Sequence, residues 1–342
     1  MSEALFIKVQ RYLNRHYPGS MLSSFALLSG GWECDIYTFT FTFGDGRSRD
    51  LVLRLFLGND DDNAAKTRRE SAGLVQLYRA GYPVPEMLLA ETDTRVLGKA
   101  FIIMEKVNGQ GLWGAMASAE PLREDLLLDQ FGRLVARLHQ LDWKPFTEHT
   151  TRYQVDPAAV LEDWFAPLRR SYREYHVEGF LNVIDWLDAH KSDITVQPAV
   201  VHLDFHANNV LIDPTDNDRM TVIDWSQLTV SDYRSDLAWT LMIMGDHGKP
   251  GWREKLLIAY SAASGHTIPN LEYFDVMCYL KLLASTVVSI KVGMEKLGMR
   301  PENEDTRKEQ AIYLRQFADR LHNVTGLTIP EVEAALKQLT QA

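Results

Sequence analysis

The sequence has little cysteine, no excess of positive charge and no long apolar run that is free of charge. Its 342 residues include only two cysteines, Cys34 and Cys278, which are too few for a disulfide framework. The formal net charge of −10 argues against a nucleic-acid-binding surface, because such a surface needs basic side chains to neutralise phosphates. The N-terminal segment lacks the apolar block of a signal peptide, so we expect a reducing, cytoplasmic compartment.

The most apolar segment, residues 276–294, is interrupted by Lys281 and Lys291. A membrane-spanning helix needs about 20 consecutive residues that are largely uncharged. The segment therefore predicts a buried helix, and we expect no membrane partner.

The chain does contain 46% hydrophobic residues, as a folded globular protein does. Its 342 residues are more than usually fold around one hydrophobic core, so the length predicts two lobes. Aromatic residues alternate with threonines over 36–43, and leucines occupy every second position over 51–57, with Arg54 on the other side. This period of two predicts two strands joined by a turn at 44–46. A helix over 59–81 and a strand over 99–107 are expected to follow.

Helical patterns dominate from about residue 120, apart from short β-type runs between 199 and 225. The expected fold class is therefore α+β. We expect a β-rich N-terminal lobe over 1–104, a hinge over 105–111, and a larger helical C-terminal lobe over 112–342. A helical insert is expected near 143–200.

Residues 201–213 read VHLDFHANNVLID, with His202, Asp204 and His206 at a spacing of two. In a strand this spacing places three possible metal ligands on one side, as a His/Asp metallohydrolase would require. The remaining histidines are scattered singly and show no ligand spacing, so this is the remoter alternative.

A glycine pattern at 109–114, GQGLWG, fits G-x-G-x-x-G and follows an expected strand, as a dinucleotide-binding turn would. However, Trp113 would crowd a pyrophosphate, and no alternation of parallel strands with helices follows. A turn between lobes is the better interpretation. The chain also lacks the G-x-x-x-x-G-K-[ST] loop of P-loop enzymes.

A different subset of the 201–213 stretch suits phosphoryl transfer, namely Asp204 and Asn209, read together with Asp224 in VIDW. The reaction needs a carboxylate that orients the acceptor hydroxyl and takes its proton, and oxygen ligands that hold magnesium on the ATP phosphates. Asp204 suits the first role, and Asn209 and Asp224 suit the second. The plainer alternative is a turn formed by Asp204 with Asn209 as its capping partner.

This arrangement resembles the catalytic and metal-binding segments of the eukaryotic-like kinases, specifically the aminoglycoside phosphotransferase and choline kinase group. LLSGGWECDIYTF, FIIMEKVNG and SDLAW match further segments of that group in the same order. The resemblance implies a bilobal protein-kinase-like fold, ATP and Mg²⁺ as cofactors, and a small-molecule hydroxyl as acceptor. DWS in place of the protein-kinase DFG, and the lack of a following APE, favour a small molecule over a protein substrate.

The resemblance also assigns roles at the start and the end of the matched region. Ser29, Gly30 and Gly31 would form the loop that covers the phosphates, with an ordinary turn as the alternative. Asp236 is expected to be structural, and His202 is expected to brace the catalytic loop.

In the strand and hinge segments, the resemblance assigns the nucleotide contacts. Arg54 stands where the family usually has a phosphate-pairing lysine, and Glu70 stands where the ion-pair partner belongs. Arginine and lysine are not interchangeable, so a buried structural pair is the alternative. Met104 would line the adenine pocket, and the backbone at Glu105 and Val107 would bind the base.

The expected function is an ATP- and magnesium-dependent phosphotransferase that acts on a small-molecule hydroxyl, in an amino alcohol, an aminoglycoside or a sugar-like compound. The alternative is a non-catalytic kinase-fold module that binds nucleotide or regulates, and Arg54 is its only support. The acidic balance and the tryptophans would suit a cationic acceptor. His206 is left open between structure and substrate, and no motif fixes the acceptor, ATP over GTP, a metabolic or resistance role, or the oligomeric state.

Overall fold

The structure, a computed structural model, describes residues 2–30, 34–57, 60–265, 267–293, 297 and 304–341. Two compact units are present. The first contains the described residues up to Leu112 together with Val210–Gln227, and the second contains the remaining described residues. From the sequence alone, 210–227 had been placed in the C-terminal lobe.

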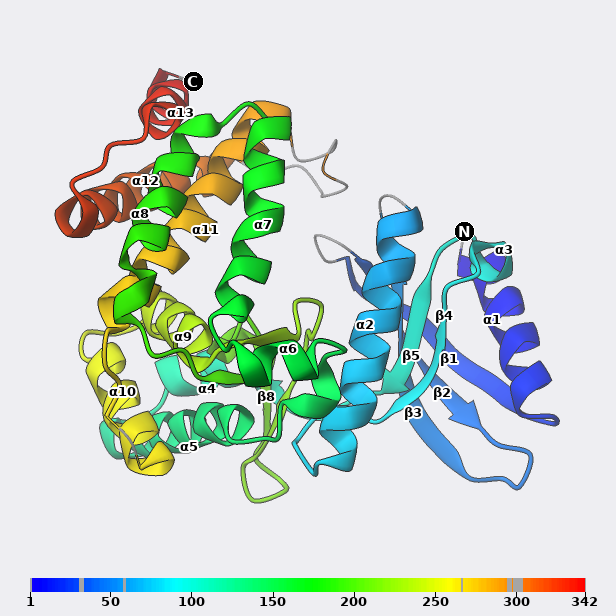
Figure 1. The fold of residues 1–342 in the computed structure, drawn as a ribbon. Coiled ribbons are helices and arrows are strands. Elements are labelled where there is room, and N and C mark those ends of the chain that lie inside the picture. The colour runs from blue at the N-terminus through cyan, green and yellow to red at the C-terminus, as the bar shows by residue number, and fades with distance from the viewer. Residues whose placement is uncertain are drawn as a thin grey trace. The chain divides into compact units, whose positions relative to one another are not determined.

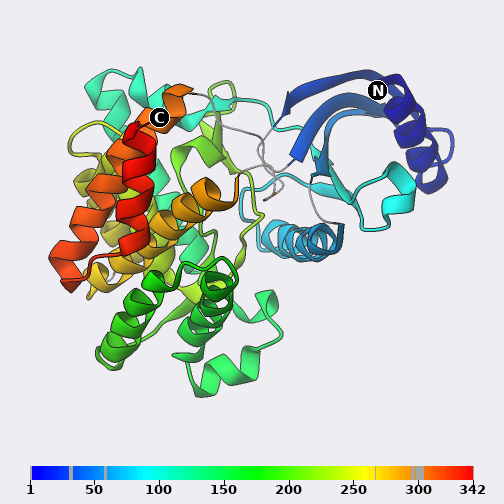
Figure 2. The ribbon, with the colours of Figure 1, turned by 90° about the horizontal axis from the view of Figure 1, so that it is seen from above.

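The first unit is built on a five-stranded antiparallel sheet in the order β1-β2-β3-β5-β4. Figures 1 and 2 show its strands between helices α1 and α2. The elements are α1 (Ser2–His16), β1 (Met21–Gly30), β2 (Cys34–Thr42), β3 (Ser48–Phe56), α2 (Asp60–Arg79), β4 (Met87–Glu91), α3 (Thr94–Leu97) and β5 (Phe101–Glu105). The strands predicted at 36–43, 51–57 and 99–107 correspond to β2, β3 and β5, and the predicted helix is α2.

The two faces of this sheet bury different side chains because neighbouring residues of a strand point to opposite sides. Leu53 and Phe101 pack into a cluster with residues of α1. Phe56 and Ile102 lie in a second cluster on the other face, where α2 packs against β4 and β5. Arg54 is paired in register with Ile102, so its side chain belongs to the face that α2 covers.

A second, three-stranded sheet in the first unit joins the hinge segment to a hairpin, in the order β6 (Gln110–Gly111), β8 (Val210–Asp213) and β9 (Arg219–Val222). Gly109 has φ +136°, and a Cβ there would lie 2.5 Å from the carbonyl oxygen of Ile212. The glycine is therefore required for close backbone approach. This accounts for the first glycine of the pattern, Gly109, without a dinucleotide.

The second unit is mainly helical, and Figure 1 shows its long helices. Its helices are α4 (Leu112–Ala117), α5 (Pro121–His139), α6 (Thr150–Val155), α7 (Ala159–Glu174), α8 (Leu181–His190), α9 (Tyr233–His247), α10 (Trp252–Ser264), α11 (Leu271–Val292), α12 (Glu304–Thr325) and α13 (Pro330–Gln341). Short 3₁₀ turns lie at Lys144–Phe146, Glu178–Phe180, Lys191–Asp193 and Ala207–Asn209, and β7 (Pro198–Val201) pairs with β10 (Thr229–Asp232).

Helix α11 is the central helix of this unit and packs against α8, α9, α12 and α13. By length and composition alone it could cross a membrane, but 67% of its apolar window is buried inside the protein. A helix of the protein core shows such burial, so the length and composition of α11 are weak evidence for a membrane-spanning segment.

Candidate functional site

Arg54 in β3 forms a buried ion pair with Glu70 in α2. The pair follows from the strand period, because Arg54 lies on the sheet face that α2 covers and Glu70 lies in the middle of α2. The side chains of Arg54 and Glu70 are 11% and 1% exposed. The pairing expected from the resemblance is therefore present, while a phosphate contact by Arg54 stays a prediction.

Arg54 also reaches a second carboxylate. Its Nη2 lies 3.2 Å from Oδ1 of Asp224, whose side chain is 45% exposed. Burial by itself lowers the pKa of Arg54, but Glu70 and Asp224 raise it above its ordinary value, so the guanidinium stays charged. The other oxygen of Glu70, Oε2, is buried and has no hydrogen-bond partner among the described residues.

Asp224 is held by the segment around it. Its φ is +61°, an uncommon value for a residue with a side chain. The next residue, Trp225, is buried, packs edge-on against Tyr82 and donates its indole N–H to the Val222 carbonyl at 3.0 Å. In DWS the tryptophan is thus an anchor that fixes the backbone at Asp224.

The expected hinge residues lie at the end of β5. Met104 is 7% exposed and belongs to the apolar cluster on the α2 side of the sheet. The N–H of Glu105 donates to the Glu86 carbonyl at 2.8 Å, so only the carbonyl of Glu105 is left for an adenine base. Val107 follows the strand, and its expected contact with the base stays a prediction.

The expected phosphate-covering loop is described only in part. Ser29 and Gly30 end β1, paired with Ile36 and Asp35 of β2. Gly31 lies outside the described residues.

Asp204, the expected catalytic residue, lies in the second unit, between the end of β7 and the 3₁₀ turn at Ala207–Asn209. Its Oδ1 accepts the indole N–H of Trp239 at 3.0 Å and lies 3.4 Å from His206 Nε2. Its Oδ2 and its backbone carbonyl accept from the Asn209 amide, at 3.2 and 2.9 Å. Asp204 is thus oriented from three directions.

The carboxyl group of Asp204 is kept ionised. Burial raises its pKa, but the hydrogen bond and electrostatic interaction with His206, together with the interaction with Lys281, outweigh burial and bring the pKa below its ordinary value. An ionised carboxylate can accept a hydrogen bond from an acceptor hydroxyl.

Asp236, expected to be structural, clamps the loop that carries Asp204. Its carboxylate is fully buried and accepts the backbone N–H groups of His202 and Leu203, at 2.9 and 2.7 Å. It also lies 3.1 Å from Nε2 of His139, whose Nδ1 is 2.9 Å from the Tyr260 hydroxyl. This geometry agrees with the expected structural role.

Two residues near Asp204 were not assigned a site role from the sequence. Trp239 had been considered only as an aromatic that could attract a cationic acceptor, and Lys281 only as a charge that interrupts an apolar segment. Lys281 Nζ donates to the Leu203 carbonyl at 2.5 Å and lies 4.1 Å from the centroid of a Trp239 ring. A lysine in the middle of a largely apolar helix was the available signal, since burying a charge without a partner is costly.

The histidines of the 201–213 stretch are not arranged as metal ligands. His202 is fully buried and stacks on Phe205, with ring centroids 5.3 Å apart. Among the residues that the structure describes, no group of three or more His, Cys, Asp or Glu side chains is placed to hold a metal ion. The metallohydrolase alternative therefore has no support from this geometry.

The residues expected to bind magnesium have the donor chemistry that this ion prefers. Because Asn209 donates its amide N–H to Asp204, its amide oxygen is left as an acceptor. The carboxylate of Asp224 is about half exposed, and both groups offer hard oxygen atoms. The chemistry of each donor suits a magnesium ion that arrives with a nucleotide, and their joint coordination of one ion stays a prediction.

A small cavity of about 10 Å³, room for roughly one water molecule, adjoins the residues that hold Asp204. It is lined by Trp164, Leu203, Ser235, Trp239, Met277, Cys278 and Lys281.

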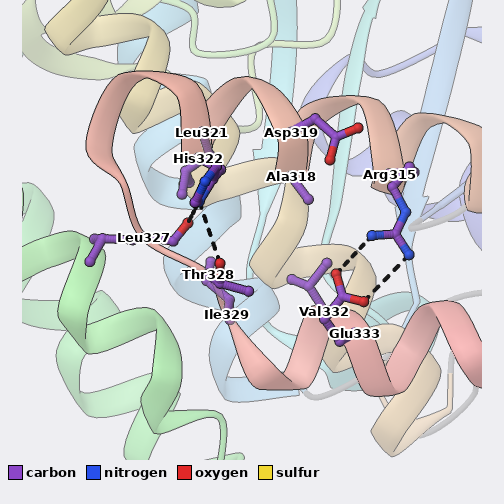
Figure 3. Close-up of a pocket in the computed structure, with 10 residues that line it drawn as sticks. All are labelled: Arg315, Ala318, Asp319, Leu321, His322, Leu327, Thr328, Ile329, Val332 and Glu333. Carbon is purple, nitrogen blue, oxygen red and sulfur yellow. Dashed lines mark hydrogen bonds and ion pairs between the residues drawn. The ribbon is translucent and has the colours of Figure 1, made fainter.

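A larger pocket, of about 210 Å³, lies between α12 and α13, where Figure 3 shows Arg315 bonded to Glu333 and His322 close to the Leu327 carbonyl. No expected site residue lines this larger pocket.

Comparisons with known proteins bear on this arrangement. A family model described as the phosphotransferase enzyme family, APH, matches residues 25–271. Acyl-CoA dehydrogenase family member 11 of Gallus gallus is 26% identical over 241 residues, which is 64% of this chain and 31% of that protein. The chain thus spans about a third of the length of this curated relative.

Solved structures share the fold. A Ralstonia eutropha protein assigned as an aminoglycoside phosphotransferase superposes with a TM-score of 0.62 at 17% identity, covering 98% of both chains. A thermostable mutant of aminoglycoside phosphotransferase APH(4)-Ia, in ternary complex with ADP and hygromycin B, superposes with a TM-score of 0.56 at 19% identity. That match covers 96% of this chain and 98% of the other. The predicted α+β, protein-kinase-like fold is confirmed.

Proposed function

This chain belongs to the phosphotransferase enzyme family, and from that premise we propose that it transfers the terminal phosphoryl group of ATP to a hydroxyl group of a small molecule. The observation that carries the proposal is the state of Asp204. Its carboxylate is oriented by Trp239, His206 and Asn209, and its pKa lies below the ordinary value. An ionised, fixed carboxylate is what a hydroxyl acceptor needs.

In the proposed reaction, Asp204 orients the acceptor O–H and takes its proton as the new oxygen–phosphorus bond forms and ADP leaves. Asn209 and Asp224 would hold magnesium, which neutralises phosphate charge when it is bound. Arg54, kept charged by Glu70 and Asp224, would contact the phosphates. The carbonyl of Glu105 would accept a hydrogen bond from the amino group of adenine.

Two classes of acceptor are supported by the similar proteins, one by a ligand bound in a solved structure and one by the name of a curated relative. A solved relative was crystallised with the aminoglycoside hygromycin B, and the curated relative is named as an acyl-CoA dehydrogenase family member. Hydroxylated acyl-CoA thioesters therefore belong in an acceptor panel beside aminoglycosides, amino alcohols and sugars. Lys281 already occupies one face of the Trp239 ring, so that face is not available to bind a cationic acceptor.

The test is ADP release from ATP and Mg²⁺ across that panel, with Asp204→Asn as the inactive variant. We expect Asp204→Asn to lower kcat by about 10²–10⁴-fold while the thermal shift given by ATP is retained. Asp213→Asn is the control. Asp213 ends β8, the next strand along the chain, and the side-chain oxygen of an asparagine there can still accept a hydrogen bond from Thr215. Nucleotide binding without turnover of any acceptor would instead favour a non-catalytic module.

A further inference from the structure

We propose that Lys281 of α11 is a positioning residue for the proposed catalytic carboxylate of Asp204, acting through the Leu203 peptide and the indole of Trp239. The proposal rests on the proposed function, since it assigns Asp204 as the residue that is positioned. Lys281 is 77 residues from Asp204 along the chain, and the packing of α11 against α9 brings the two segments together.

The first step of the argument is the backbone at Leu203. Its φ is +60°, a left-handed value that costs a residue with a side chain about 1 kcal/mol or more. Its N–H is held by Asp236 at 2.7 Å, and its carbonyl is held by Lys281 Nζ at 2.5 Å. Because Leu203 immediately precedes Asp204, these two bonds set the direction in which the Asp204 side chain leaves the backbone.

The second step is the indole of Trp239. The ammonium of Lys281 lies 4.1 Å from the centroid of a Trp239 ring, within the range of a cation–π interaction. The edge of the same side chain donates Nε1–H to Asp204 Oδ1 at 3.0 Å. The Lys281 ammonium on the face of the indole therefore restrains the orientation of the Trp239 ring, and with it the direction in which Nε1–H donates to Asp204.

The third step is the cost of placing a lysine here. Burial lowers the pKa of Lys281, whereas Asp204 and other nearby groups raise it, and the net result is a lowered pKa. Met277 and Cys278, which lie on the same face of α11 as Lys281 and line the small cavity beside it, are apolar, so an apolar residue would suit this environment at lower desolvation cost. The lysine is explained by the two groups that it holds.

The chain provides a matched control. Lys291, on the same helix, donates to the carbonyl of His176 at 2.6 Å, and His176 also has a positive φ, of +52°. Lys291 thus makes the same kind of bond as Lys281, and among the described residues it contacts neither Asp204 nor Trp239.

The experiment compares Lys281→Met, Lys281→Arg, Trp239→Phe and Lys291→Met in the full chain, with the acceptor found in the panel. We expect Lys281→Met to lower kcat by about 10–100-fold with the KM values for ATP and acceptor changed by less than about threefold. Lys281→Arg should recover part of this loss, and Lys291→Met should retain the wild-type kcat.

The double variant Lys281→Met with Trp239→Phe should lose little more than the worse single variant, because both changes break the same connection to Asp204. A kcat for Lys281→Met within twofold of wild type would overturn the proposal. A rise in acceptor KM at unchanged kcat would also overturn it, since that result assigns Lys281 to substrate binding.

A second readout needs no turnover. The indole N–H signal of Trp239 in a ¹⁵N spectrum can be identified by its loss in Trp239→Phe. We expect it to move and to exchange faster with water in Lys281→Met, and not in Lys291→Met. An unchanged signal would overturn the proposal even if no acceptor were found. Failure of the proposed function would show differently, as the absence of turnover across the acceptor panel or as full activity of Asp204→Asn.

Discussion

Arg54 Nη2 lies 3.2 Å from Asp224 Oδ1, so a residue of β3 is joined to the residue proposed to bind magnesium. Arg54 is also ion-paired with Glu70 of α2. A guanidinium can serve both carboxylates because it is a planar fork with several N–H donors. The chain thus uses arginine at this position to connect α2, β3 and the segment after β9.

Replacing Arg54 by lysine should weaken this connection. A lysine ammonium is a compact charge and cannot reproduce the two-sided contact with Glu70 and Asp224. We expect Arg54→Lys to lower kcat/KM for ATP by about 10–100-fold, measured by ADP release at varied ATP. Arg49→Lys is the control, because Arg49 is on the same strand and pairs with Glu86 at 2.7 Å on the surface. Equal activity of the two variants would count against a role for Arg54.

The proposed magnesium contact can be tested by changing Asp224. Asp224→Asn keeps the size of the side chain but removes the charge that attracts a divalent cation. We expect the Mg²⁺ concentration that gives half-maximal activity to rise about tenfold or more. This concentration is measured by removing bound metal with a chelator and then titrating Mg²⁺. Asp216→Asn, which changes an exposed carboxylate paired with Arg219 in the β8–β9 turn, should leave that concentration unchanged. An unaltered requirement in Asp224→Asn would exclude Asp224 as a ligand.

The buried carboxylate of Asp236 should contribute stability that depends on pH. Burial raises its pKa, but His139, His202 and the backbone N–H of His202 outweigh burial and lower it below the ordinary value of about 3.9. A lowered folded pKa means that the stability is present above the ordinary pKa and is lost as the pH falls through the folded pKa. Asp236→Asn should therefore reduce the free energy of unfolding by about 2–4 kcal/mol at pH 7.

That difference between wild type and Asp236→Asn should stay constant above about pH 5 and shrink below about pH 4. Urea unfolding of both proteins at several pH values measures it. A difference that grows on acidification would contradict the assigned direction of the pKa.

Gly109 and Gly111 should respond differently to the same substitution. A Cβ on Gly109 would meet the Ile212 carbonyl and occupy a positive φ, whereas a Cβ on Gly111 meets no atom within 4 Å. We expect Gly109→Ala to lower the free energy of unfolding by about 1–3 kcal/mol and Gly111→Ala to change it little. Thermal unfolding of the two variants compares them, and equal midpoints would show that the close approach is not needed.

The sequence predicted much of this site because its signals are local. The leucine alternation over 51–57 placed Arg54 on the face opposite the leucines, and that face is the one that α2 covers. The spacing of Asp204 and Asn209 likewise matches the hydrogen bonds between them, since a short turn joins the two residues. Strand period and turn spacing act over a few residues, so the sequence alone determines them.

Other parts of the site depend on packing between distant segments. Trp239 and Lys281 reach Asp204 and Leu203 only because α9 and α11 pack together in the second unit. Nothing in their local sequence specifies those partners. The bond from Arg54 to Asp224 likewise joins residues 170 positions apart. Sequence period fixes the direction in which a side chain points from its own strand or helix, whereas its partner is decided by which helices and strands bury their apolar faces against one another.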